Sequence, residues 1–591
     1  MRETNRKSLA IIYDLTRQWF FFDILSIGAK LGIILGVLIP TLLSFIIGIL
    51  ILQKSNSFSM KNIESQAALG YFLGLSINIV FIILLDSIIN DFQISLYLVL
   101  LLEIICVLAN INLVKSLIKR VYTFHYFKFL ISVCFTYTFL SVFWTRDLSE
   151  ANQPTGSYGT LHSYRYAWLS NVLVECKVVP NVGQNIGQSL LTAISSTLSS
   201  TQIPYLYLGI WLSISLVMFL RLIINLLIQI GVDKKTSHYA ATLFIFLGCS
   251  VSFKYISVVD SGYPLLLNGY TDAVLGTAIF LALCYVLTKK SEIKSNNFDK
   301  FILFTMFSCS YFVAPQNIPI LFLFLSTNLL LLKLYSYPEA HDIKTKGIIF
   351  MVASVVSVPL GGFFSPSTFR SKINVPDVKP VNNLIFDFLP GYPFISSTST
   401  QSYQQGEHLI MKLLETLQNS NSSIQVKFLT VADFIASNLM AMALPILGFL
   451  LLITLRNKFK VFVQNSRTNY VPNVIAIWVL VSSIILQFTI PSFLRISGYK
   501  WELTRFAIPF FVIGNLILSV MAIRSVCKNS IKDYFFVSVA LVALIGPLTY
   551  LGSTTLLNFT NFGKTFRQEI YLGPGPEVDQ SFCKTFINAR N

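Results

Sequence analysis

Residues 66–89 read QAALGYFLGLSINIVFIILLDSII, and residues 94–114 read ISLYLVLLLEIICVLANINLV. Each run is apolar almost throughout and is close to the roughly 20 residues that a helix needs to cross a bilayer. Only a short connection containing Asn90 and Asp91 separates them. The two runs therefore predict an antiparallel pair of membrane-spanning helices.

The rest of the chain repeats this pattern, and the composition agrees with it. Of the residues, 54% are hydrophobic and 12% are charged, whereas a soluble domain carries roughly 25% charged residues and would aggregate with so few. We expect an all-α, polytopic transmembrane bundle of about thirteen helices, some of them short or broken. The runs are 27–52, 66–89, 94–114, 126–144, 205–231, 237–258, 263–288, 301–334, 347–364, 434–455, 473–494, 503–525 and 534–551.

Two long polar stretches interrupt the apolar runs and are expected to be structured extracytoplasmic loops. Aromatic residues recur in the first loop, which has a predicted helix at 161–175, and prolines recur in the second, with a predicted helix at 407–418. Ordered surface loops of this kind commonly form a binding surface. The predicted organisation is 1–144 (an interfacial segment and membrane helices), 145–203 (first loop), 204–364 (membrane helices), 365–430 (second loop), 431–551 (membrane helices) and 552–591 (tail).

The formal net charge of +17 orients the helices. Lysines and arginines gather in short connections, such as 289–300 and 524–532, which the positive-inside rule places in the cytoplasm. A continuous basic face is absent, which argues against nucleic acid as a partner. The basic N-terminus fits less well, because four spans before residue 145 would place it outside. Either the 27–52 run is a hairpin kinked at Pro40, or the rule is broken there.

Two further features follow from this topology. The run 301–334 is too long for one span, and Pro315 predicts that two short helices meet there, facing the working interior of the bundle. Of the eight cysteines, only Cys176 and Cys583 fall in segments placed outside. We therefore predict that these two form a disulfide.

The first loop carries a cluster of groups with chemical potential. Asp147 and Glu150 follow a predicted span, and His162 and Arg165 share a helix face three residues apart. A carboxylate at a membrane surface can act as general base on an acceptor hydroxyl, and an arginine can bind a phosphate with two hydrogen bonds. The alternative is that these charges only solvate and fold the loop.

Other candidate residues stand where predicted spans meet the outer face. Asp272 lies at the entrance of an apolar run, either as a functional carboxylate or as a helix cap. Glu502 and Arg505 open a later span as a local pair or, for the arginine, as a headgroup ligand. The turn 180–189 holds Gly183 and Gly187, which fit a close ligand approach but favour an ordinary turn before a helix.

These segments together resemble the GT-C-type membrane glycosyltransferases, especially the bacterial aminoarabinose and mannosyl transferases. The resemblance covers about residues 126–525 and rests on five segments. These are the first loop from Tyr158 to Pro180, the Gly-Tyr-Thr-Asp272 opening, the break at Pro315, the Pro390-Gly-Tyr-Pro393 stretch of the second loop, and the helix start Arg505-Phe-Ala-Ile-Pro509. Related families often have an Asp directly after the first-loop Tyr, whereas Gly159 follows Tyr158 here.

The resemblance implies an enzyme that transfers a sugar from a polyprenyl-phosphate carrier to an extracytoplasmic acceptor. Asp147 or Glu150 would then be the base, His162 would line the sugar site, and the phosphate would be bound by Arg165, Arg370 or Arg505. The implied partners are the lipid-linked donor and membrane lipids, and the implied location is a bacterial inner or plasma membrane. No cofactor is required, although a divalent metal at Asp147 or Glu150 stays open. The alternatives are a polysaccharide polymerase or ligase, a transporter, or a non-catalytic membrane protein.

Overall fold

The computed structural model describes residues 27–55, 63–122, 162–179, 186–229, 232–247, 271–288, 297–314 and 340–360. It also describes the strands 386–388 and 494–496 and isolated residues between 317 and 329, 417 and 427, 516 and 541, and 573 and 584. The expected spans 126–144, 434–455 and 473–494 lie outside these residues, as do the N-terminal 26 residues.

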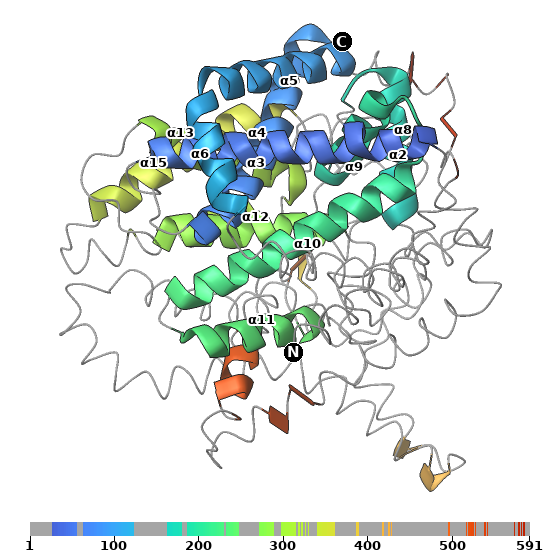
Figure 1. The fold of residues 1–591 in the computed structure, drawn as a ribbon. Helices are drawn as coiled ribbons and strands as arrows, with labels where there is room; N and C mark the ends of the chain where they lie inside the picture. The colour runs from blue at the N-terminus through green and yellow to red at the C-terminus, as the bar shows by residue number, and fades with distance from the viewer. Residues whose placement is uncertain are drawn as a thin grey trace, which may run out of the picture.

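The described residues form an all-α polytopic bundle (Figure 1). Among them, five helical segments are long and apolar enough to cross a membrane: 30–54, 67–89, 92–109, 204–228 and 341–360. The elements are α2 (Ile27–Ile33), η1 (Ile34–Leu38), α3 (Ile39–Lys54), α4 (Ile63–Ile89), α5 (Phe92–Ala109), α6 (Ile111–Tyr122), α8 (His162–Cys176), α9 (Gly187–Ser199), α10 (Pro204–Gln229), α11 (Lys234–Leu247), α12 (Thr271–Thr288), α13 (Asn297–Val313) and α15 (Ala340–Leu360), with strands β1 (Phe386–Phe388) and β2 (Leu494–Ile496).

The first span is one continuous helix, so the hairpin alternative at Pro40 is wrong. The chain passes from α2 through the wide turn η1 directly into α3. Proline has no backbone N–H and crowds the preceding turn, and a π-type turn just before Pro40 accommodates it without reversing the chain. The amide of Ile39 bonds the carbonyl of Ile34, five residues earlier.

Glycines bring α3 and α4 into direct backbone contact. A Cβ atom added at Gly48 would overlap the carbonyl of Gly70, and one added at Gly74 would overlap the carbonyl of Ser44. Small residues permit this close approach, which strengthens dispersion contacts between membrane helices where the hydrophobic effect is weak. The α3–α4 pair is thereby the tightest helix contact at the centre of the bundle.

We distinguish two ends of the bundle: the disulfide end, which contains Cys176 and Cys583, and the lysine end, which contains Lys54 and Lys346. At the disulfide end, the turn between α4 and α5 contacts the residues after α8, because the amide of Phe92 donates to Lys177 O at 2.6 Å. The start of the first span is also there, since Gly32 packs against Tyr207 near the start of α10. At the lysine end, Ser55 after α3 donates to Asp299 in α13.

This arrangement decides the second alternative for the N-terminus. The first span begins at the disulfide end and finishes at the lysine end, beside Asp299. Its first residues therefore lie on the same side as α8, and we predict that this is the outer side. If that side is the outer one, the first span departs from the positive-inside rule, which is the second of the two alternatives.

The predicted break in the 301–334 run is confirmed. Helix α13 ends at Val313, two residues before Pro315. Phe307 of α13 stacks edge-on against Phe350 of α15, and Tyr311 donates to Ser354. From the first pair to the second, the residue number rises by four in both helices, so α13 and α15 run parallel. The described residues between 317 and 329 are helical, and Ile318, Leu321 and Leu325 are buried whereas Phe322 and Ser326 are exposed.

One short sheet joins two distant segments of the chain. Strands β1 and β2 pair antiparallel, with Asp387 opposite Arg495. The pairing links the second loop to the connection before the 503–525 run, two regions expected on the same face. The predicted helix 407–418 of that loop lies outside the described residues except for 417–418, which are helical.

Candidate functional site

Three of the predicted site residues fall on described helices. His162 and Arg165 occupy the first turn of α8, which confirms the predicted helix to within one residue at each end. Asp272 lies in the first turn of α12 rather than before it, where a carboxylate interacts favourably with the helix N-terminus. Asp147, Glu150, Arg370, Glu502 and Arg505 lie outside the described residues.

The far end of α8 is fastened to the rest of the molecule. Cys176 forms a disulfide with Cys583, with Cα atoms 5.0 Å apart, as predicted. Leu169, Val172 and Val178 form a small apolar cluster around it. In addition, the amide of Val179 donates to the Asp86 carboxylate at 3.1 Å. Helix α8 is therefore tied to the membrane bundle and to the C-terminal tail.

A carboxylate beside the disulfide has an altered pKa. Partial desolvation raises the pKa of Glu175, a hydrogen bond from Gln202 opposes this, and the nearby charge of Glu577 raises it further. Two carboxylates at this position repel each other. Their placement gives the disulfide end a local negative charge on an otherwise basic chain.

Helix α9 is a polar helix that is buried in the bundle. It packs against α8, α10, η1, α12 and α13. Its polar side chains are almost fully inaccessible: Gln188, Ser189, Thr192, Ser195 and Ser196. Buried polar groups cost free energy unless they are hydrogen-bonded, so such a helix needs internal partners or a polar ligand.

Part of α9 has internal partners, and Pro40 explains why. Because Pro40 has no N–H, it cannot bond the carbonyl of Gly36 four residues earlier. Ser195 donates to that carbonyl at 2.7 Å and accepts from the indole N–H of Trp211 at 2.8 Å. Gly36 allows this approach, since a Cβ there would lie 2.6 Å from Ser195 O. The helix is thus anchored to the first span.

The start of α9 meets the break at the end of α13. The amide of Ile186 donates to Phe312 O at 3.0 Å, and a side chain at Gly187 would overlap Val313. Gly187 thus serves close helix packing, which agrees with the ordinary reading of that turn. Just beyond the break, Asn317 donates to Gly276 O at 3.0 Å. Since Gly276 is one turn after Asp272, the break, α9 and the opening of α12 adjoin.

Gln188 stands out at this junction. It is fully buried, and neither its amide nitrogen nor its amide oxygen has a hydrogen-bond partner. The hydroxyl of Ser189 is likewise buried without a partner. A buried polar atom that lacks a partner costs about 1–3 kcal/mol. An amide that can both donate and accept here is suited to a hydroxyl-bearing ligand or to water.

Sequence reasoning missed this junction. The sequence 180–189 is rich in amides, Gln188 among them, and in glycines, and it predicts an ordinary turn before a helix, but nothing in it places Gln188 against the α13 break. A usable signal was the density of Ser, Thr and Gln between residues 188 and 201 directly before a span. A second missed residue is Glu103, the one acidic residue within the 94–114 run, which the cost of intramembrane charge marks as a functional candidate.

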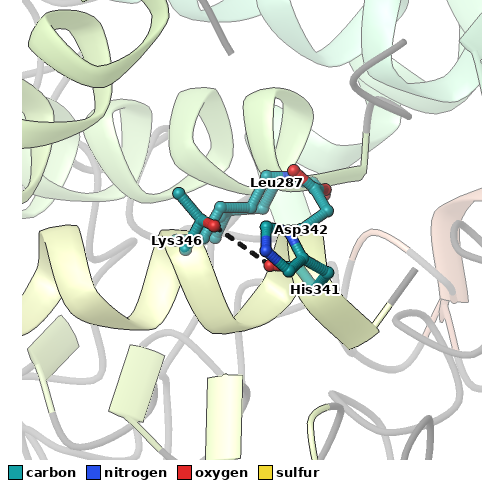
Figure 2. A network of polar contacts seen from close by, with 5 residues as sticks. Leu287, His341, Asp342 and Lys346 are labelled. Atoms are coloured by element: carbon teal, nitrogen blue, oxygen red, sulfur yellow. Dashed lines mark hydrogen bonds and ion pairs between the residues drawn. The ribbon is translucent and has the colours of Figure 1, made fainter. Parts of the chain in front are cut away.

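The lysine end holds a buried cation with a structural role (Figure 2). Lys346 of α15 is 3% exposed, pairs with Asp342 at 2.6 Å and donates to Leu287 O at 3.4 Å. Leu287 is in the last turn of α12, whose carbonyls attract a cation. His341, drawn beside the pair, belongs to the same first turns of α15. This network attaches α15 to α12.

Within the described ranges, no group of three or more His, Cys, Asp or Glu side chains could hold a metal ion. Comparison of the chain with protein-family models, with curated proteins and with solved structures finds no match. The described residues show that the chain is a membrane protein with an all-α polytopic fold.

Proposed function

We propose that this membrane protein is a GT-C-type glycosyltransferase that moves a sugar from a polyprenyl-phosphate carrier to an acceptor outside the cytoplasm, in a bacterial inner or plasma membrane. The observation that supports this best is the junction of α9, the α13 break and the opening of α12. It combines a buried, unpartnered Gln188 amide with the first turn that carries Asp272. Amides and hydroxyls in an enclosed position are the groups that bind sugar hydroxyls.

In this proposal the candidate residues divide the chemistry between them. Asp147 or Glu150 removes the proton from the acceptor hydroxyl as it attacks the anomeric carbon, and the carrier phosphate leaves. Arg165, Arg370 or Arg505 stabilises the charge that develops on that phosphate. His162, Asp272 and Gln188 orient the sugar, while Glu502 positions Arg505.

Transfer from a radiolabelled polyprenyl-phosphate hexose by the purified protein in nanodiscs tests the proposal. We expect Asp147→Asn or Glu150→Gln to lower turnover by about a hundredfold or more, which is typical for loss of a general base. Matched controls are Glu175→Gln at the far end of α8 and His238→Gln on α11, where the exposed His238 ring is hydrogen-bonded to Lys234 O of its own helix. Both controls should retain transfer.

The outcome shows whether Asp147 or Glu150 is a catalytic base or only solvates the loop. If both carboxylate variants and their double variant keep wild-type turnover, neither residue is the base. Retained folding, read from the melting temperature, distinguishes loss of chemistry from loss of structure. Gln188→Leu should weaken donor binding more than it lowers turnover at saturation, because it removes an orienting contact.

The polymerase or ligase alternative makes a different prediction about the acceptor. A polymerase would require an acceptor that is itself polyprenyl-linked and would give a ladder of products, whereas a transferase would add one sugar.

Transport is a second candidate, because the α13 break and the buried Glu103 are features that transporters place near the bilayer centre. Uptake of labelled sugar or drug-like substrates into proteoliposomes, driven by a pH gradient, would favour this reading over transfer. A chain that shows neither activity would be a non-catalytic member.

A further inference from the structure

Glu103 lies in the middle of a membrane span and turns away from lipid. It follows Phe92, the first residue of α5, by eleven residues, or about 17 Å along the helix axis. Its neighbours Leu102 and Ile104 are 53% and 43% exposed, whereas Glu103 is 4% exposed. Phe92, Leu96 and Val99 are buried on the same helical stripe. The carboxyl group is therefore on the face of α5 that packs against α3 and α4.

The facing helices present a polar chain to this carboxyl group. Asn78 of α4 donates to the Ser44 hydroxyl at 2.8 Å, and Ser44 donates to Pro40 O at 2.8 Å. Gly74 brings the backbones together, because any side chain there would overlap Ser44 O. The carbonyl of Pro40 and the amide of Asn78 are thereby held in a fixed line across α3 and α4.

At the Asn78 end of this hydrogen-bond chain, the amide oxygen lacks a donor unless Glu103 supplies a proton. Asn78 lies at the level of Glu103, because Asn78 is eleven residues before the end of α4 at Ile89 and Glu103 is eleven residues after the start of α5 at Phe92. Oδ1 of Asn78 and both carboxyl oxygens of Glu103 are buried without a hydrogen-bond partner. An ionised carboxylate only accepts hydrogen bonds and cannot satisfy an amide oxygen, whereas a carboxylic acid donates one.

Among the described residues of α3, α4 and α5, no cationic side chain lies at the level of Glu103. Asp86 of α4 is about 12 Å beyond Asn78 along the helix, and Lys54 of α3 is about 15 Å beyond Ser44. Tyr71 is occupied by Ser215. The other titratable residues on α5 are Asp91, Tyr97 and Cys106, and Cys106 is one turn from Glu103 but exposed. The titratable residues on the other helices that contact α5 are Glu64, Lys115, Lys119, Arg120, Tyr122, His162, Tyr164, Arg165, Tyr166, Glu175 and Cys176.

We propose that Glu103, Asn78 and Ser44 form a proton-binding site at the centre of the bundle, in which Glu103 is the neutral acid and donates its hydrogen to Oδ1 of Asn78. An ionised carboxylate at this depth is strongly disfavoured, and the neutral acid also completes the Asn78–Ser44–Pro40 chain. The site binds one proton, which neutralises the carboxylate of Glu103. It stands apart from the transfer junction at α9 and does not depend on that function.

Infrared spectroscopy of the full-length protein in nanodiscs at neutral pH tests the site. We expect a protonated-carboxyl carbonyl band that is absent in Glu103→Gln and present in Asp91→Asn, a control on the same helix that keeps its helix cap. Glu103→Gln mimics the neutral acid and should change the melting temperature by less than about 4 °C. Asn78→Leu should shift the carbonyl band, because the hydrogen-bond acceptor is lost.

Three outcomes would overturn the proposal. The first is a wild-type minus Glu103→Gln difference spectrum that contains only carboxylate bands. The second is carboxylate bands together with a sodium-dependent rise in melting temperature that Glu103→Gln abolishes, which would identify a cation site instead. If Glu103→Gln fails to fold, wild type labelled with ¹³C-glutamate still gives the answer. The absence of a labelled protonated band at neutral pH is then the third such outcome.

Discussion

The two ends of the bundle are held together by different chemistry. At the disulfide end, a covalent bond and backbone hydrogen bonds join α8 to the α4–α5 turn and to the tail. At the lysine end, hydrogen bonds of charged side chains join the helices: Lys346 of α15 donates to Leu287 O of α12, and Asp299 of α13 accepts from Ser55 after α3. The difference follows from loop length. Short basic connections orient the helices and also cap them, whereas long loops need cross-links to stay ordered.

The largest expected effect is at the disulfide end. Cys176→Ser removes a bond between residues 407 positions apart, and we expect a loss of about 3 kcal/mol, within the usual range for a native disulfide. Thermal melting of the purified protein measures it, and reduction of wild type should give the same shift. Cys106→Ala, at an exposed free cysteine, is the control. Equal melting of Cys176→Ser and wild type would show that noncovalent contacts suffice at this end.

The next effect is at the lysine end and depends on which partner is removed. Asp342→Ala takes the carboxylate from a buried Lys346, and we expect a loss of about 2 kcal/mol, below the full cost for a buried pair because Asp342 is 26% exposed. Lys346→Met keeps the packing and leaves a partly hydrated carboxylate, so it should cost less. If Lys346→Met melts lower than Asp342→Ala, the hydrogen bond to Leu287 O dominates and the ion pair matters little.

A smaller effect concerns the helix cap at the α4–α5 turn. Asp91 accepts a hydrogen bond from the amide of Ile94 at 2.9 Å. Asp91→Ala should cost about 1 kcal/mol in melting stability, whereas Asp91→Asn, which can still cap, should cost a few tenths at most. Similar losses in both variants would mean that the charge of Asp91, and not its cap, stabilises this turn.

Much of the fold was predictable because apolar length is a local property. The span 66–89 lies within α4, the span 94–114 covers most of α5 and, after a break at Asn110, the first turn of α6, and Pro315 correctly marked the end of α13. The Cys176–Cys583 bond followed from parity alone, since only two cysteines fell on the expected outer side. What sequence could not decide was the direction of the first span, because a local charge cluster conflicted with parity, and the packing of Gly32 against Tyr207 places the start of this span at the disulfide end.

The candidate site was less predictable, because its residues act through tertiary contacts. The placement of Gln188 depends on Gly187 meeting Val313, and that of Ser195 depends on the carbonyl left free by Pro40. Neither contact has a sequence signature. Glu103 was different, since an acid inside an apolar run is visible in the sequence and only its burial against Asn78 required the structure.

The smallest expected effect compares how the two ends respond to pH. Burial and the charge of Glu577 raise the pKa of Glu175 above 4.5. The folded state therefore binds this proton more tightly, and stability falls as pH rises from about 4.5 through the folded-state pKa. At the other end, hydrogen bonds from Thr236 lower the pKa of Asp233 below 3.8, helped by Arg524. There the added stability is present above pH 3.8 and is lost as pH falls through the lowered pKa.

Melting curves from acidic to neutral pH should show Glu175→Gln slightly more stable than wild type at neutral pH and equal to it in acid. Asp233→Asn should be slightly less stable than wild type at neutral pH, and that difference should also vanish in acid. If both variants shift the melting temperature in the same direction at neutral pH, then the two ends do not differ electrostatically in the way their contacts imply.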